Sequence, residues 1–89
     1  MAEYRAQHKQ FIIKENTIIN PEKFGSWMLI NYGTNPIIIN DTIVIQQNKN
    51  YRVDLEPNVI FDTSINIKFD TTGGGTNRAA MIQITHIAI

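Results

Sequence analysis

Cysteine is absent from this chain of 89 residues, so no disulfide bond can stabilise its fold. A single domain of this length buries only about 60–65% of the surface that its unfolded chain exposes. Small domains commonly gain further stability from a disulfide, a bound metal or a partner. With disulfides excluded and metal ligands scarce, we expect docking or oligomerisation to contribute.

Excess charge and long apolar runs are also missing. Lys and Arg together number 8, Asp and Glu also number 8, and the net charge is zero. Proteins that bind nucleic acids through phosphate contacts are normally basic, so we expect no nucleic-acid partner. No stretch approaches the roughly 18 apolar residues that indicate a membrane span. The polar start of the chain lacks the apolar region of a signal peptide, which predicts a protein that is made in the cytoplasm of its host and used without export.

Catalytic and metal-binding motifs are not found. His8 and His86 are the only histidines, and we interpret one as a surface residue and the other as partly packed. The Gly73-Gly74-Gly75 run lacks the following Lys of a phosphate-binding loop. One face of a predicted strand carries oxygen ligands, for which a solvated surface is the simpler interpretation: Asp62, Ser64 and Asn66. We therefore predict no enzyme, no cofactor and no metal site.

Alternation of apolar and polar residues with a period of two dominates the remaining sequence. It is clearest from Phe61 to Thr71 and recurs around Tyr51–Leu55 and Phe11–Ile13. Such alternation indicates half-buried strands. Apolar runs at Ser26–Tyr32 and Ala79–Ile89 are typical of further strands, with Trp27 as a core residue. In the last strand the apolar side shifts after Ile84, which predicts a bulge or twist near Thr85-His86.

Turn-forming residues separate these runs. Asn40-Asp41 predicts a two-residue hairpin turn, because Asn and Asp tolerate positive φ. Thr71–Arg78 contains the three glycines and is predicted to be a flexible hairpin loop. About seven short antiparallel strands at roughly 8–12-residue spacing indicate an all-β fold, a single small β-sandwich or barrel.

The two ends of the chain differ from the middle. Residues 1–10 are polar and without a clear pattern, so we predict an N-terminal arm followed by one β domain over residues 11–89. The last residues are apolar, and a strand that ends this way must be buried in its own fold or against a neighbour. The predicted partner contacts lie at these ends and in the glycine loop: Tyr4, Arg5, Gly74, Arg78, Ile87 and Ile89.

Two segments of the chain form one pattern: Asn31-Tyr32-Gly33-Thr34-Asn35-Pro36-Ile37-Ile38-Ile39-Asn40-Asp41-Thr42-Ile43-Val44-Ile45 and, after it, Tyr51-Arg52-Val53-Asp54-Leu55. Together they resemble a pattern of small bacteriophage virion proteins. In these proteins a strand ends in Asn-x-Gly and a short hairpin leads to a polar turn and an aromatic-led strand. Gln46–Asn50 departs from the Pro-Gly common in that turn. The resemblance implies a β-sandwich of the capsid decoration, or head auxiliary, type. The chain's 17 isoleucines and 10 asparagines suggest an AT-rich genome, which suits many bacteria and their phages.

The leading hypothesis is therefore a structural protein of the virion that contacts capsid or neck proteins, or further copies of itself as a homo-oligomer. The alternative is a carbohydrate- or surface-binding module of a fibre or receptor-binding protein, using exposed aromatics beside amides: Trp27, Asn31, Tyr32 and Asn35. A third hypothesis, an OB-like face that stacks single-stranded nucleic acid, uses Tyr32, Tyr51, Phe61 and Phe69 with Arg52 and Lys68. Zero net charge argues against the third hypothesis.

Overall fold

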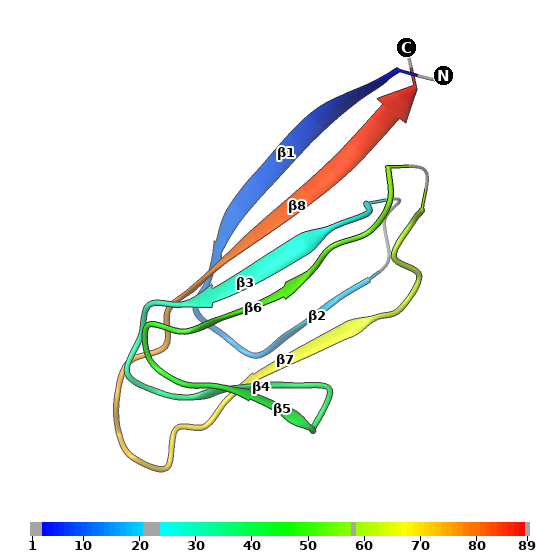
Figure 1. Ribbon diagram of the computed structural model, residues 1–89. Coiled ribbons are helices and arrows are strands. Elements are labelled where there is room, and N and C mark those ends of the chain that lie inside the picture. The colour runs from blue at the N-terminus through cyan, green and yellow to red at the C-terminus, as the bar shows by residue number, and fades with distance from the viewer. Residues whose placement is uncertain (1–2, 21–23, 58, 89) are drawn as a thin grey trace.

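A computed structural model describes residues 3–20, 24–57 and 59–88, and for Tyr4 and Ala88 it describes the backbone alone. The described residues contain strands and no helix (Figure 1). The all-β prediction is therefore confirmed. Eight strands form in this part of the chain: β1 (Tyr4–Ile13), β2 (Thr17–Ile19), β3 (Trp27–Asn31), β4 (Ile37–Ile39), β5 (Ile43–Ile45), β6 (Asn50–Val53), β7 (Ile65–Phe69) and β8 (Ala79–Ala88).

The strands pair as a long hairpin folded onto itself. β1 pairs with β8, β2 with β7, β3 with β6 and β4 with β5, all antiparallel. Two further pairings, β3 with β8 and β4 with β7, close the described strands into sheets of order β1-β8-β3-β6 and β2-β7-β4-β5. Eight antiparallel strands in this order form a jelly roll, a sandwich of two sheets. Each sheet ends in edge strands that have no further partner among the described strands, so of the two predicted alternatives the sandwich is correct and the barrel is wrong.

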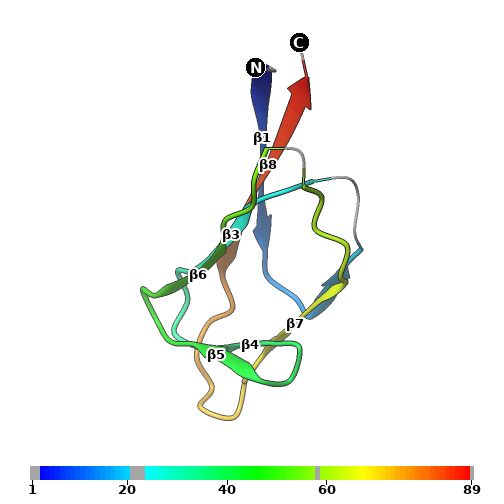
Figure 2. The ribbon, with the colours of Figure 1, turned by 45° about the vertical axis from the view of Figure 1, so that its right-hand side comes forward.

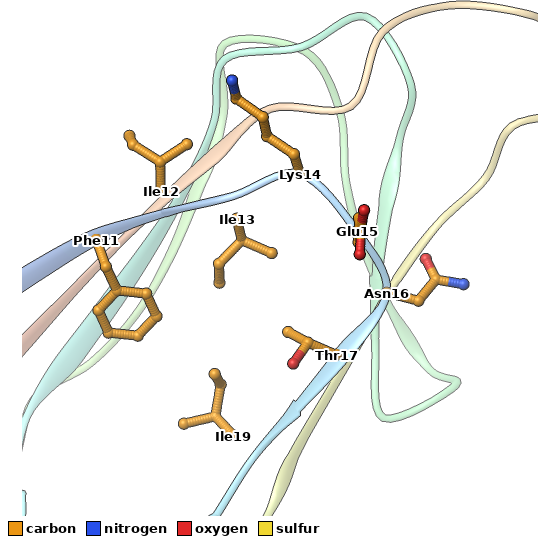
Figure 3. Close-up of a pocket in the computed structure, with 8 residues that line it drawn as sticks. All are labelled: Phe11, Ile12, Ile13, Lys14, Glu15, Asn16, Thr17 and Ile19. Carbon is orange, nitrogen blue, oxygen red and sulfur yellow. The ribbon is translucent and has the colours of Figure 1, made fainter.

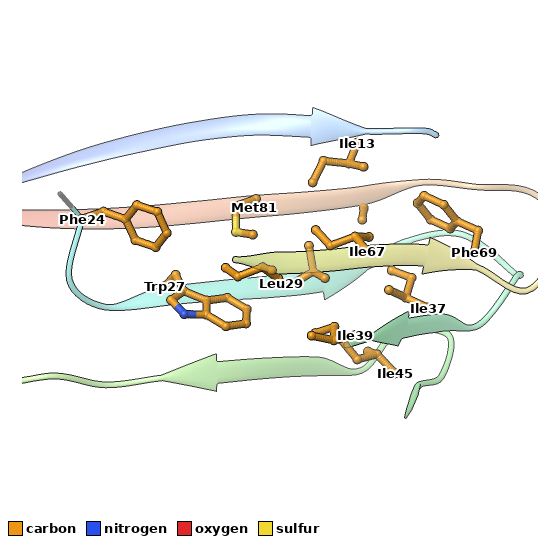
Figure 4. Close-up of a cluster of buried hydrophobic side chains, with 12 residues drawn as sticks. Ile13, Phe24, Trp27, Leu29, Ile37, Ile39, Ile45, Ile67, Phe69 and Met81 are labelled. Carbon is orange, nitrogen blue, oxygen red and sulfur yellow. The ribbon is translucent and has the colours of Figure 1, made fainter. Parts of the chain in front are cut away.

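The hydrophobic core lies between the two sheets. Along β3, β4 and β7 every second residue is buried, because successive side chains of a strand point to opposite faces. Trp27 is buried as predicted and contacts Tyr51 and Phe61. The core residues in Figure 4 come from both sheets and include Leu29, Ile37, Ile39, Ile45, Ile67, Phe69 and Met81.

The hairpin between β4 and β5 turns on Asn40 and Asp41, which both have positive φ as expected. Thr42 N–H donates to the Ile39 carbonyl across this turn. The loop nevertheless has three residues, because Ile39 is the register partner of Ile43 and Thr42 lies between the turn and β5.

Two other strand predictions were wrong in detail. The strand expected from Phe61 to Thr71 begins only at Ile65. Phe61 instead donates its backbone N–H to the Phe24 carbonyl and packs against the Phe24 ring, so a loop contact replaces sheet pairing there. The bulge expected at Thr85-His86 is absent from the described pairing, because β1 and β8 keep a continuous register. The apolar shift means that Ile84 and Ile87 lie on opposite faces of one regular strand.

The side-chain amide of Asn31 fastens the end of the sandwich where β3 leaves its sheet. Asn31 is fully buried, and its Nδ2 donates 3.0 Å hydrogen bonds to the carbonyls of Asn35 and Ile45. Its Oδ1 accepts a hydrogen bond of 3.0 Å from the Gly33 backbone N–H. Asn31 therefore satisfies three buried backbone groups in the connection from β3 to β4 and at the end of β5, across both sheets.

We expect Asn31→Ala to lower the free energy of unfolding by about 2–4 kcal/mol, because three buried polar groups lose their partner. The measurement is urea-induced unfolding followed by the fluorescence of Trp27, the single tryptophan. Asn20→Ala removes an exposed amide and serves as the control, with an expected change within about 0.5 kcal/mol. Equal stability of the two variants would contradict this role of Asn31.

Candidate functional site

The outer part of β1 and β8 forms a two-stranded ribbon that extends beyond the sandwich (Figures 1 and 2). β3 accompanies β8 only as far as Trp27 opposite Gln83. Two further hydrogen bonds, from Gly25 N–H to the Ile84 carbonyl and from Ile84 N–H to the Ser26 carbonyl, end that contact. Beyond them the register continues between β1 and β8 alone, and the molecule reaches 51 Å along its long axis.

The tip of this ribbon brings together three of the predicted contact residues. Arg5 is the register partner of Ile87, and Tyr4 is the partner of Ala88. Arg5 is exposed and Ile87 is 37% exposed. Ile89 lies outside the described residues. The segment predicted as a polar arm therefore continues as a strand from Tyr4 to Ile13, without a break at residue 10.

The other two predicted contact residues, Gly74 and Arg78, lie at the opposite end of the molecule, in the connection from β7 to β8 (Figure 1). This segment joins the two sheets, so it is not the hairpin loop that its composition predicted. Backbone groups of this segment form hydrogen bonds with other residues of the same chain. The Asn35 side-chain carbonyl accepts from Gly75 N–H, and the Thr34 hydroxyl accepts from Thr76 N–H.

The start of the same connection holds one perturbed carboxyl group. The Thr72 hydroxyl donates a 2.7 Å hydrogen bond to Asp70, and the Thr72 backbone N–H donates another of 3.1 Å. The side-chain hydrogen bond contributes more than the backbone hydrogen bond. Both favour the ionised form and hold the pKa of Asp70 below its ordinary value. The carboxylate therefore acts as a turn-forming acceptor in this exposed loop.

The core contains or contacts several residues of the other two predicted binding surfaces. Trp27, Asn31 and Asn35 are buried, which leaves Tyr32, 53% exposed, as the one accessible member of the aromatic–amide set. In the set proposed to stack bases, Phe69 is in the core, and Tyr51 and Phe61 pack against it.

Acid–base and metal-binding groups are dispersed over the described part of the chain. No cluster of three or more His, Cys, Asp and Glu side chains occurs there. His8 is exposed and His86 is half-buried, as interpreted from the sequence. The Asn66 backbone N–H is occupied by a hydrogen bond to the Asn40 side chain. No helix of the described residues is long and apolar enough to cross a membrane.

A shallow hollow of about 460 Å³ opens at the corner between β1 and β2. Phe11, Ile13 and Ile19 point into it, whereas the side chains of Lys14 and Asn16 point away (Figure 3). It lies where the edges of the two sheets separate and is walled by partly buried core residues. Its lining offers apolar contact and no set of converging polar groups.

Sequence reasoning missed the solvent-facing side of the β1-β8-β3-β6 sheet. Ile12 is 50% exposed there, and Met28, Ile30, Ile82 and Ile84 are half-buried. The signal was present in the runs Ser26–Tyr32 and Ala79–Ile89, where both sides of the strand carry apolar residues. The described residues cover only one side of this sheet.

Comparison with protein-family models, with curated proteins and with solved structures finds no match for this chain.

Gly33 allows the close approach of the two loops at the end opposite the ribbon. A Cβ atom at this position would meet the Thr76 carbonyl and the Arg78 backbone nitrogen, neither of which can rotate away. We expect Gly33→Ala to lower the free energy of unfolding by about 1–3 kcal/mol. At Gly73 a Cβ meets nothing within 4 Å, so Gly73→Ala is the control, with no loss expected. Chemical denaturation followed by Trp27 fluorescence measures both, and equal effects would contradict the tight contact.

Proposed function

We propose that this chain is a non-enzymatic structural protein of a bacteriophage particle that docks on capsid or neck proteins through the β1–β8 ribbon. The observation that supports the proposal most directly is the ribbon itself. An isolated two-stranded ribbon is at best marginally stable in water, and three or more strands are normally required. A ribbon that extends beyond its own sandwich gains stability when a neighbour supplies the third strand.

The outer edge of β1 is suited to that addition. β1 has ten residues, whereas the other edge strands described, β2, β5 and β6, have three, three and four. Short edge strands are a common protection against unwanted pairing, and β1 lacks it. A partner strand placed along β1 would gain backbone hydrogen bonds over most of its length.

The residues of β1 whose backbone faces this edge follow from the ladder pattern. Ile84 exchanges hydrogen bonds with the β3 side, so the neighbouring residues Gln83 and Thr85 face β1. Their partners Lys9 and Gln7 therefore bond to β8, and the backbone groups of Ala6, His8 and Gln10 point to the outer edge. No described strand pairs with that edge.

Fold and composition support the same proposal by analogy. Jelly rolls include capsid proteins of viruses, although they also include lectins and enzymes, so the fold alone does not identify a function. A neutral chain is suited to protein partners. If each copy buries about 800 Å² on its lattice, individually weak contacts become strong when many act together.

The experiment is to induce phage in the strain that carries the coding sequence and to purify particles on a density gradient. We expect the chain to co-sediment with intact particles at many copies per particle, measured by quantitative mass spectrometry. Recovery of the chain only in the soluble fraction of the lysate would refute the virion role.

The contact edge is tested on particles that lack the chain, with purified variants added back. We expect His8→Pro to lose binding, because proline removes a backbone N–H at the outer edge and leaves the bonds to β8 intact. His8→Ala keeps that N–H, so it is the matched control and should bind like the wild type. Circular dichroism checks that both variants are folded. Equal binding by both would exclude edge pairing as the mode of docking.

A further inference from the structure

The hollow at the corner between β1 and β2 is an opening in the side of the hydrophobic core. β1 and β2 are edge strands of the two sheets, and residues 14–16 connect them directly. The hollow of about 460 Å³ opens beside this connection, and Phe11, Ile13 and Ile19 point into it (Figure 3). Ile13 belongs to the core, and Phe11 and Ile19 are half-buried against it. An apolar group placed in the hollow would therefore extend the core.

The β1 backbone beside this hollow faces outward at every second residue. Lys9 bonds to β8, so strand alternation turns the backbone of Phe11 and Ile13 toward β8 as well. The backbone groups of Gln10 and Ile12 therefore point to the outer edge, where no described strand pairs with them. Such groups accept the backbone of an extended segment. One added strand can thus bond to this edge and reach the hollow at the same time.

The ladder pattern defines which side chains of an added antiparallel strand would enter the hollow. Its residues opposite Phe11 and Ile13 would form non-hydrogen-bonded pairs, in which side chains of the two strands approach most closely. These two residues are separated by one whose side chain points to the other face of the sheet. Because the hollow offers apolar contact, it favours apolar side chains at both positions.

The same side of β1 becomes basic toward the ribbon. Arg5, Gln7 and Lys9 share the side of Phe11, because successive side chains alternate between the faces. Lys9 Nζ lies 5.7 Å from the centroid of the Phe11 ring. An acidic residue opposite Lys9 would form a favourable cross-strand pair. The charge of β1 therefore complements a partner strand whose apolar residues are followed by an acidic one.

We propose that the β1 edge accepts a strand of another protein with the order apolar, any, apolar, any, acidic, whose two apolar side chains fill the hollow between β1 and β2. This selection rests on the proposed docking through the β1 edge, and it adds which strand the edge accepts. Backbone hydrogen bonds hold the strand, and the hollow distinguishes one sequence from another.

A second copy of this chain does not supply such a strand. The other edge strands described, β2, β5 and β6, have three, three and four residues, so only β1 is long enough. We considered antiparallel registers of β1 with itself that overlap most of the strand and keep outward-facing residues opposite one another. The residue opposite Phe11 is then polar or charged in every case: Glu3, Arg5, Gln7 or Lys9. Such a group in the apolar hollow would be unfavourable.

The first test compares two capped peptides of identical composition on the full chain labelled with ¹⁵N. The alternating peptide is ITITETTTE, and the adjacent peptide is IITTETTTE, in which only one isoleucine at a time can face the hollow. We expect NMR titration to give about ten- to hundredfold tighter binding of the alternating peptide, because it buries one more isoleucine. Its binding should shift the amide signals of Gln10 and Ile12.

A pair of variants tests the hollow from the β2 side, without changing the β1 edge. Ile19→Thr places a hydroxyl in the wall of the hollow, and we expect the alternating peptide to bind about fivefold more weakly or worse. Ile18→Thr is the matched control, because Ile18 is 59% exposed and alternates to the outer side of β2. It should bind like the wild type. Circular dichroism checks that both variants are folded.

Several results would overturn the proposal. Equal affinity of the two peptides would show that the hollow does not select the strand, and no binding of either at about 1 mM would show that the edge does not accept one. Amide shifts at Ile18 in place of Gln10 and Ile12 would locate the strand on β2. The same shifts at Gln10 and Ile12 on concentrating the chain without peptide would assign the edge to a second copy.

Addition of the variants to phage particles separates the hollow from the proposed function. We expect His8→Pro and Ile19→Thr both to lose binding, with Ile18→Thr unchanged. Loss by His8→Pro alone would leave the edge as the docking element and exclude the hollow. A chain that does not co-sediment with particles but prefers the alternating peptide would refute the virion role and support the strand-binding site.

Discussion

β1 and β8 pair along ten residues, from Tyr4 opposite Ala88 to Ile13 opposite Ala79. The pairings of β2 with β7, β3 with β6 and β4 with β5 are nested inside this one. The outermost pair joins segments that lie far apart in the sequence, so the entropic cost of closing its loop is smaller once the inner pairs have formed. The same pair then supplies an edge strand and a central strand of one sheet. Its length beyond β3 decides that the molecule is elongated and carries a ribbon.

The end of the sandwich away from the ribbon is held by polar contacts in place of a disulfide. The buried amide of Asn31, at the end of β3, bonds to backbone groups of the β3–β4 connection and of β5 in the other sheet, and the loop at Gly33 fits closely against Thr76. Asn35 and Thr34 then bind the glycine-containing connection before β8. These contacts determine where β8 begins. Because β8 is paired with β1 in a continuous register, they also determine the position of the ribbon at the other end.

The β1 edge and the outer face of the β1-β8-β3-β6 sheet are not covered by the described residues, and they offer different chemical groups. The β1 edge offers backbone donors and acceptors, which recognise any extended strand and depend little on its sequence. The face around Ile12 and Ile82 offers apolar side chains, whose contribution depends on area and shape. One copy can use both at once, because the edge points along the sheet and the face points away from it.

The sequence by itself determined the all-β class, the place of the turn at Asn40-Asp41 and the burial of Trp27, because side-chain alternation and turn chemistry are local properties. The choice of a sandwich over a barrel came from the tertiary structure. The sequence also placed Tyr4, Arg5 and Ile87 at the two ends of the chain. Only the tertiary structure decided that these ends pair, that β7 starts at Ile65, and that Asn31 and Asn35 are buried, because strand pairing depends on residues far apart in the chain. The apolar outer face had the same origin. A run such as that of β8 shows that both sides of a strand are apolar, and only the arrangement of the sheets shows which side is left uncovered.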